Sequence, residues 1–234
     1  MKSLNLEIEK ELLKHGASQI GFADVSELSV QVTGNFLRAV SIAVALNHQI
    51  IHDISRGPTK EYFAEYERVN NLLAELCERA VEIITRAGKR AEAVKATTEH
   101  FDPSTLSVRL QHKTIATRAG LGWIGKSALL ITQKYGPAIR LGTVLTNAGF
   151  EIGEPINDSH CGQCRNCMEA CPAHAIVGQN WKSGVARESI YNAFACRETA
   201  KELARQQEIP VTICDICINV CPWTQKYISR EITT

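Results

Sequence analysis

The cysteines in the second half of the chain are the residues whose spacing most directly indicates chemistry. Residues 160–172 read HCGQCRNCMEACP, in which four cysteines follow the spacing C-x2-C-x2-C-x3-C and precede a proline. Residues 213–222 read ICDICINVCP and repeat the last three cysteines and the proline. In the bacterial iron–sulfur pattern, three cysteines of a block ligate one [4Fe–4S] cluster and the cysteine before the proline ligates the other. The spacing therefore predicts two clusters that exchange ligands.

The same rule divides the cysteines of this region into two sets. Cluster one is expected to bind Cys161, Cys164, Cys167 and Cys221. Cluster two is expected to bind Cys171, Cys214, Cys217 and, displaced from its own block, Cys196. Cys196 ends the stretch VARESIYNAFAC, which we expect to be helical. Structural zinc, which also uses C-x2-C pairs, is the alternative, but it explains neither the two C-P endings nor the spacing.

The composition places the chain among globular proteins without a strong overall field. Its 234 residues are 44% hydrophobic and carry a formal net charge of +1, so charge alone recruits neither nucleic acid nor an anionic membrane. The start, MKSLNLEIEKELLKHG, has no apolar core of a secretory signal. We expect a cytoplasmic protein, and because that compartment keeps thiols reduced, its nine cysteines indicate metal ligation rather than disulfides.

The glycine-rich segment GLGWIGKS (120–127) matches two phosphate-binding patterns. Both patterns need a strand before the loop and a helix after it, so that the helix N-terminus faces phosphate. Here the helix-like RLQHKTIATRA precedes the loop and the strand-like ALLIT follows it. We therefore expect Lys126 and Ser127 not to bind a nucleotide. The glycines would instead permit close backbone approach or turn the chain.

The pattern of apolar residues predicts a sheet covered by helices, in an α/β or α+β arrangement. Helices are expected over 4–14, 59–87 and 109–120, and strands over 19–25, 39–46, 91–97, 127–132 and 138–147. Cys77 falls in the apolar stripe of the long helix and is interpreted as a core residue. The polar stretch GEPIND (153–158) reads as a linker, so we expect one domain over 1–152 and a second over 153–234.

Several segments, taken in order, resemble the epoxyqueuosine reductases. They are RAGLGWIGKSALLI, LGTVLTN, the first cysteine block, a lone cysteine and CDICINVCPW, with SQIGFADVSEL and AVSIAVALN as further likenesses near the start. These reductases are grouped with the reductive dehalogenases among cobalamin-dependent iron–sulfur enzymes. The resemblance implies a cobalamin-binding α/β domain followed by a bacterial ferredoxin-like domain with two [4Fe–4S] clusters.

The resemblance also implies an activity and a cofactor site. An external low-potential donor of the ferredoxin or flavodoxin type would pass electrons through both clusters to the corrinoid cobalt, and we expect the reduction of an unknown small substrate. The residues implied near the corrinoid are Gly122, Trp123, Leu130, Leu141, Val144, Asp215 and Ile216.

Two departures from the family pattern concern the proton donor and tRNA. The family's proton-donating aspartate falls on Leu106, which leaves Asp102, His112 and Tyr66 as weaker candidates. Longer family members continue into a helical-repeat domain that helps to hold tRNA, whereas this sequence ends soon after CPWTQKY. The net charge of the chain is also near zero. For these reasons we expect neither tRNA as a partner nor reduction of epoxyqueuosine.

Two other functions remain open at this stage. The first is an iron–sulfur electron carrier or corrinoid-reducing protein without substrate chemistry, which Leu106 favours. The second is an ATP-driven reductase activator of the P-loop type, which the reversed order of helix and strand around 120–127 disfavours.

Overall fold

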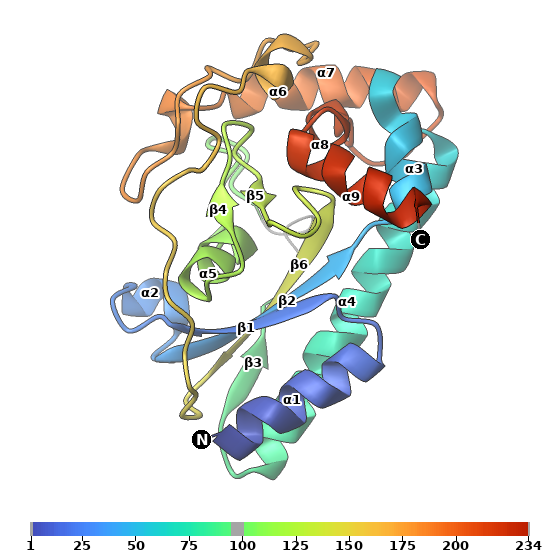
Figure 1. The fold of residues 1–234 in the computed structure, drawn as a ribbon. Coiled ribbons are helices and arrows are strands. Elements are labelled where there is room, and N and C mark those ends of the chain that lie inside the picture. Colours follow the sequence, from blue (N-terminus) through green and yellow to red (C-terminus); the bar gives the residue numbers. More distant parts are fainter. Residues whose placement is uncertain (1, 95–100, 234) are drawn as a thin grey trace. The chain divides into compact units, whose positions relative to one another are not determined.

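The computed structural model describes residues 2–94 and 101–233 (Figure 1). The chain divides into two compact units, each built from separated stretches. The first unit comprises 1–45, 69–121 and 140–156, and the second comprises 46–68, 122–139 and 157–234. The sequence predicted a single boundary between residues 152 and 153. The second unit instead includes 46–68 and 122–139 in addition to the cysteine-rich part.

The first unit contains a four-stranded sheet with the strand order β1-β2-β6-β3. Its strands are β1 (Gln19–Asp24), β2 (Arg38–Ala45), β3 (Ala91–Ala93) and β6 (Ile139–Thr146). Strands β1 and β2 pair antiparallel with Gly21 opposite Ser41, and β3 pairs antiparallel with β6 with Glu92 opposite Leu145. The predicted strand over 91–97 is shorter in the structure, and its last three positions lie outside the described residues.

Helices cover both faces of this sheet. They are α1 (Lys2–Lys14), α2 (Val30–Thr33), α4 (Lys60–Arg86), of which residues 69–86 belong to this unit, and α5 (His112–Arg118). On one face α4 lies so close to β6 that a Cβ at Gly142 would be 2.7 Å from the Cys77 Sγ atom. On the other face Ile115 of α5 packs with Leu145, since residues an odd number apart on a strand point to opposite sides.

The second unit is made of short elements around the cysteine loops. They are α3 (His48–Asp53), η1 (Ile54–Arg56), β4 (Trp123–Ile124), β5 (Leu130–Ile131), α6 (Asn166–Glu169), η2 (Arg187–Ser189), α7 (Ala193–Gln206), α8 (Ile216–Asn219) and α9 (Pro222–Ile232). Strand β5 is all that forms of the strand predicted over 127–132, and it pairs antiparallel with β4. The prediction that a helix ends at Cys196 is also wrong, because α7 begins at Ala193 and continues beyond that cysteine.

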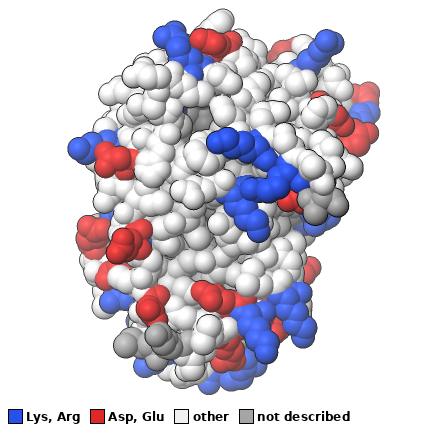
Figure 2. Space-filling model, viewed as in Figure 1, with Lys and Arg blue, Asp and Glu red and all other residues white. Residues whose placement is uncertain are grey.

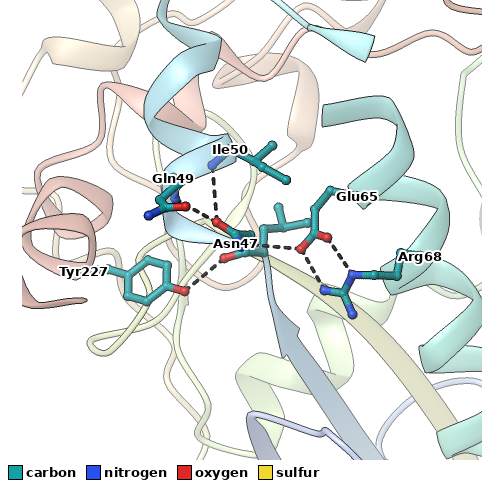
Figure 3. A network of polar contacts seen from close by, with 7 residues as sticks. Asn47, Gln49, Ile50, Glu65, Arg68 and Tyr227 are labelled. Carbon is teal, nitrogen blue, oxygen red and sulfur yellow. Dashed lines mark hydrogen bonds and ion pairs between the residues drawn. The ribbon is translucent and has the colours of Figure 1, made fainter. Parts of the chain in front are cut away.

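A buried polar network explains why 46–68 belongs with the second unit (Figure 3). The Glu65 carboxylate, whose side chain is 4% exposed, accepts hydrogen bonds from the Asn47 backbone N–H at 2.8 Å and from the Arg68 guanidinium at 2.7 and 2.8 Å. The Tyr227 hydroxyl of α9 donates to the Leu46 carbonyl at 3.0 Å. The bond from Tyr227 links 46–68 to α9, 181 positions away, whereas the bonds of Glu65 lie within 46–68. Over the described residues, no helix has the length and apolar character needed to span a bilayer.

Candidate iron–sulfur site

A pocket in the second unit brings together the first predicted set of cysteines. It is lined by Cys161, Cys164, Cys167, Cys217 and Cys221. Its other walls are Gly125, Lys126, Ser127, Ile131, Pro222 and Trp223. The first three cysteines come from one tight loop, in which the Cys164 N–H donates to the Cys161 carbonyl at 3.1 Å, and Cys221 is the residue before α9. A loop of this kind supplies three convergent thiolates for one cluster.

The thiols of this set influence one another. Burial, and then the neighbouring thiols of Cys161, Cys221 and Cys164, raise the pKa of Cys167 to about 11. Burial also raises the pKa of Cys221 to about 11. Thiols with such pKa values are protonated near neutral pH. Assembly of a cluster must therefore release protons, as metal binding by thiolates generally does.

The second predicted set also converges. Cys171 forms a small apolar cluster with Ala175 and Ile176, against which Cys196 and Cys217 pack. Burial raises the pKa of Cys214 to about 11, with further contributions from its neighbours, which include Cys196 and Cys171. Burial also raises the pKa of Cys217 well above its ordinary value, with Asp215, Cys196 and Cys214 adding to the effect. These four side chains therefore surround one small volume.

The two sets of cysteines adjoin each other. Cys217 of the second set also lines the pocket of the first, and Cys167 of the first packs against Cys171. Among the residues that the structure describes, no three His, Cys, Asp or Glu side chains converge closely enough to hold one metal ion. Ligation by each named cysteine remains a prediction.

Tyr191 is a neighbour of the second set that the sequence did not single out. It packs beside Cys196 and hydrogen-bonds to that thiol. Burial raises the pKa of Cys196, and the hydrogen bond from Tyr191 opposes this effect. Hydrogen bonds to ligand sulfurs are one of the factors that set cluster potentials. The backbone bridge between Ile176 and Tyr191, which positions this tyrosine, cannot be read from local sequence.

The glycine-rich segment supports the cysteine pocket rather than a phosphate site. Residues 125–129 connect β4 to β5, so no helix follows the loop, as the sequence predicted. The Lys126 ammonium is buried and donates to the Cys164 carbonyl at 2.8 Å. Gly122 is required because a Cβ there would overlap the Ile131 carbonyl oxygen. Lys126 and Gly122 therefore have structural partners within the second unit.

An aromatic group adjoins the pocket. Trp123 stacks on His160, with ring centroids 4.6 Å apart, and meets Trp223 edge-on at 5.3 Å. Trp123 is 1% exposed, and no hydrogen-bond partner of its indole Nε1 is found within the described part of the chain. A buried donor without a partner is costly. A sulfur acceptor on a group bound nearby would reduce that cost, so the residues present fit a cluster.

Asp215 and Ile216, both implied near the corrinoid, lie between two cysteines of the second set. Asp215 has φ = 60°, and its carboxylate accepts a hydrogen bond of 2.6 Å from the hydroxyl of Tyr62. Ile216 begins α8 and is buried. The sequence did not indicate Tyr62, because its partner is far along the chain.

The residues implied near a corrinoid are divided between the two units. Gly122, Trp123, Leu130, Asp215 and Ile216 belong to the second unit, and Leu141 and Val144 belong to the first. Leu141 is partly exposed on β6, whereas Val144 is fully buried. Because they are three residues apart on one strand, their side chains point to opposite faces of the sheet. Contact of these residues with a corrinoid remains a prediction.

The three candidate proton donors have different surroundings. Asp102 is exposed, and hydrogen bonds from the Ser104 side chain and backbone lower the pKa of its carboxyl group. His112 is partly buried in the first unit, with its Nδ1 2.9 Å from the Thr143 hydroxyl on β6. Tyr66 is buried in α4.

Comparison with known proteins confirms the class of protein that this site indicates. Residues 160–224 match the family described as "4Fe-4S double cluster binding domain". This match covers both cysteine blocks and supports two iron–sulfur clusters rather than zinc. The cysteine-rich part of the chain is therefore a double-cluster iron–sulfur domain.

The resemblance to epoxyqueuosine reductases is also confirmed. The epoxyqueuosine reductase of Synechocystis sp. is 40% identical over 121 residues, which cover 50% of this chain and 41% of the relative. That of Gloeobacter violaceus is 34% identical over 145 residues, which cover 58% of this chain and 44% of the relative. The chain is epoxyqueuosine reductase-like, and the match spans about two fifths of these relatives' length.

Solved structures support the predicted fold class. A catabolic reductive dehalogenase matches with a TM-score of 0.69 and 19% identity, over 93% of this chain and 31% of the dehalogenase. The epoxyqueuosine reductase from Streptococcus thermophilus matches with a TM-score of 0.65 and 22% identity, over 94% of this chain and 66% of that one. The prediction of an α/β domain joined to a double-cluster domain is confirmed at the level of the fold.

One prediction from the sequence is contradicted. We expected tRNA not to be a partner, from Leu106, the net charge and the end of the sequence. A further epoxyqueuosine reductase was solved with an epoxyqueuosine-modified tRNA stem loop. It matches this fold with a TM-score of 0.65 and 20% identity, over 96% of this chain and 66% of that one. Together with the curated relatives, this finding overturns the exclusion of tRNA.

Proposed function

We propose that this protein is a cobalamin-dependent iron–sulfur reductase that acts on epoxyqueuosine in tRNA. This replaces the unknown small substrate expected from the sequence. The observation that carries the proposal is the pair of adjoining cysteine sets in a chain whose fold matches both epoxyqueuosine reductases and reductive dehalogenases. A pair of clusters alone can only relay electrons, so the α/β unit implies a second cofactor and a reaction.

In this proposal the two cysteine sets hold clusters that carry electrons from an external low-potential donor. Conversion of an epoxide to an alkene, with the oxygen lost as water, consumes two electrons and two protons. When bound, the corrinoid supplies a cobalt centre that is a strong nucleophile and reductant once it is reduced. Asp215 and Ile216 would bring the second cysteine set toward it, since they lie between Cys214 and Cys217.

His112 is the best-supported proton donor among the three candidates. Its imidazole is held by Thr143, which lies two residues after the proposed corrinoid residue Leu141 on β6 and therefore points to the same face of the sheet. Imidazoles exchange protons near neutral pH. Asp102, in contrast, has a lowered pKa and is ionised near neutral pH, which makes it a poor acid.

The test uses the full chain with reconstituted clusters, hydroxocobalamin and dithionite, incubated anaerobically with tRNA that contains epoxyqueuosine. The tRNA is then digested and its nucleosides are measured by mass spectrometry. We expect queuosine over several turnovers. We also expect a fall of roughly 10²–10⁴-fold in rate for His112→Asn, which is the range for a positioned acid, and little change for Asp102→Asn. Absence of queuosine with fully loaded protein and bound corrinoid would refute the proposal.

A second function is favoured by one residue. Leu106, which replaces the family's acid, lies in the loop before α5 with φ = 51° and cannot donate a proton. An electron carrier or corrinoid-reducing protein would not need that acid. Such a protein would reduce bound corrinoid at the expense of the external donor but would form no queuosine.

A further inference from the structure

A group of basic side chains lies on α9 and the nearby loop of the second unit. Lys226 and Arg230 are four residues apart on this helix and thus share a face. The Arg230 guanidinium donates to the Lys134 carbonyl, which brings the loop residue Lys134 beside the helix. All three are exposed, and Figure 2 shows lysine and arginine side chains as a connected group where Figure 1 draws α9.

This basic group borders the pocket of the first cysteine set. The Lys226 ammonium lies 4.6 Å from the ring centroid of Trp223. Trp223 lines the pocket together with Cys161, Cys164 and Cys221, all of which are partly exposed. An electron that arrives at this surface is therefore one aromatic side chain away from the place where cluster one would bind.

We propose that Lys134, Lys226 and Arg230, with Trp223 between them and the first cysteine set, form the docking surface for an acidic, single-electron donor protein. This inference rests on the proposed function for its direction of electron flow. In the docked complex one electron leaves the donor, which is oxidised, and reduces the first cluster, and no bond forms or breaks. Complementary charge steers such transient partners and sets their rate of association.

The surface fits a redox protein better than a nucleic acid. A polyanion is held by cations that neutralise many phosphates along its length, whereas this group contains three cations. Among the described residues, no acidic side chain forms an ion pair with Lys134 or Lys226, and both lie instead beside aromatic rings. The ring beside Lys226 is that of Trp223, which lines the pocket.

The test measures the rate at which a reduced acidic flavodoxin reduces the clusters of the full-length, cluster-loaded protein, by anaerobic stopped-flow absorption. Lys134→Glu/Lys226→Glu is compared with the wild type and with Arg56→Glu/Lys201→Glu. The control has the same charge change at two other exposed positions of the second unit. Binding of oxidised flavodoxin is measured in parallel by calorimetry, and dithionite replaces flavodoxin to show that the clusters are intact.

At low salt we expect the surface variant to react with flavodoxin at least roughly tenfold more slowly than the wild type, because steering contributes a factor of this order. We expect unchanged reduction by dithionite, weaker binding, and a rate for the control variant close to that of the wild type. Added salt should slow the wild type toward the surface variant.

Equal flavodoxin rates in the wild type and the surface variant would overturn the proposal, as would equal losses in both double variants. A variant that loses affinity for tRNA but keeps its flavodoxin rate would identify a nucleic-acid surface and would also overturn it. The queuosine assay uses dithionite, so its failure tests the reductase proposal separately from the docking surface.

Discussion

The hydroxyl of Tyr62 donates a hydrogen bond of 2.6 Å to the carboxylate of Asp215, across 153 positions of sequence. Tyr62 is fully buried in α4, and Asp215 has a left-handed backbone with φ = 60° between Cys214 and Ile216. A left-handed conformation is tolerated by aspartate but costs energy. The bond therefore fixes the loop that presents two cysteines of the second set.

We expect Tyr62→Phe to weaken this loop. Hydrogen bonds to charged groups contribute about 1.5–3 kcal/mol, so the free energy of unfolding should fall by about that amount. Iron should also be lost faster from cluster two than from cluster one, as followed by EPR of the reduced protein. Tyr135→Phe is the matched control, because it removes a hydroxyl from another buried tyrosine of the second unit. Equal stability and iron retention in Tyr62→Phe and Tyr135→Phe would contradict the role of the bond.

Cys196→Ala should remove the fourth ligand of cluster two. We expect the iron content to fall from about 8 per chain, the value for two four-iron clusters, to about half, or one cluster to become a three-iron form. Cys77→Ala is the control, because Cys77 belongs to the first unit and both cysteine sets belong to the second. Burial raises the pKa of its thiol to about 12. Full iron and an unchanged EPR signal in Cys196→Ala would show that the ligand is misassigned.

We expect no nucleotide binding in the wild type, so Lys126→Met should leave the response to Mg-ATP unchanged. The ammonium already donates to the Cys164 carbonyl, and no helix follows the loop. Calorimetric titration of the wild type with Mg-ATP should give no saturable heat, while the variant should release iron from cluster one faster. Micromolar binding of Mg-ATP that Lys126→Met abolishes would support the P-loop alternative.

Gly142→Ala should destabilise the first unit, because its Cβ would be 2.7 Å from the Cys77 Sγ atom. Overpacking of this kind costs about 1–3 kcal/mol. In Gly142→Ala/Cys77→Ala the sulfur is removed, and the added methyl group can occupy its space. Thermal unfolding should therefore show that the double variant loses less stability than the sum of the losses in the two single variants. If the two losses simply add, the close contact between the methyl group added at position 142 and Cys77 is relieved by a shift elsewhere.

Local sequence signals predicted the elements that form by themselves. The apolar stripe from Phe63 to Ile84 gave the long helix almost to its ends, because a period of three to four residues needs no distant partner. The cysteine spacing likewise predicted which thiols converge, since each block is one short loop. The displaced Cys196 was assigned by counting the thiolates that two clusters require, and its ligation stays a prediction.

Features that depend on distant contacts were missed. The grouping of 46–68 with the cysteine-rich part depends on bonds such as that from the Asn219 side chain to the Ile51 carbonyl, 168 positions away. The structural role of Lys126 depends in the same way on Cys164. The strand expected over 127–132 is short because the chain there lines a pocket instead of continuing a sheet. Neither propensity nor periodicity contains this information.

We expect above all that the chain binds a corrinoid that the two clusters supply with electrons. The most direct measurement is anaerobic gel filtration of the cluster-loaded chain with hydroxocobalamin, with cobalt and iron determined in each fraction. We expect cobalt to co-elute with the protein at about one per chain, beside the roughly eight iron atoms of two four-iron clusters. Complete separation of the red chromophore from protein that retains its full iron content would contradict the claim and would leave an electron carrier as the function.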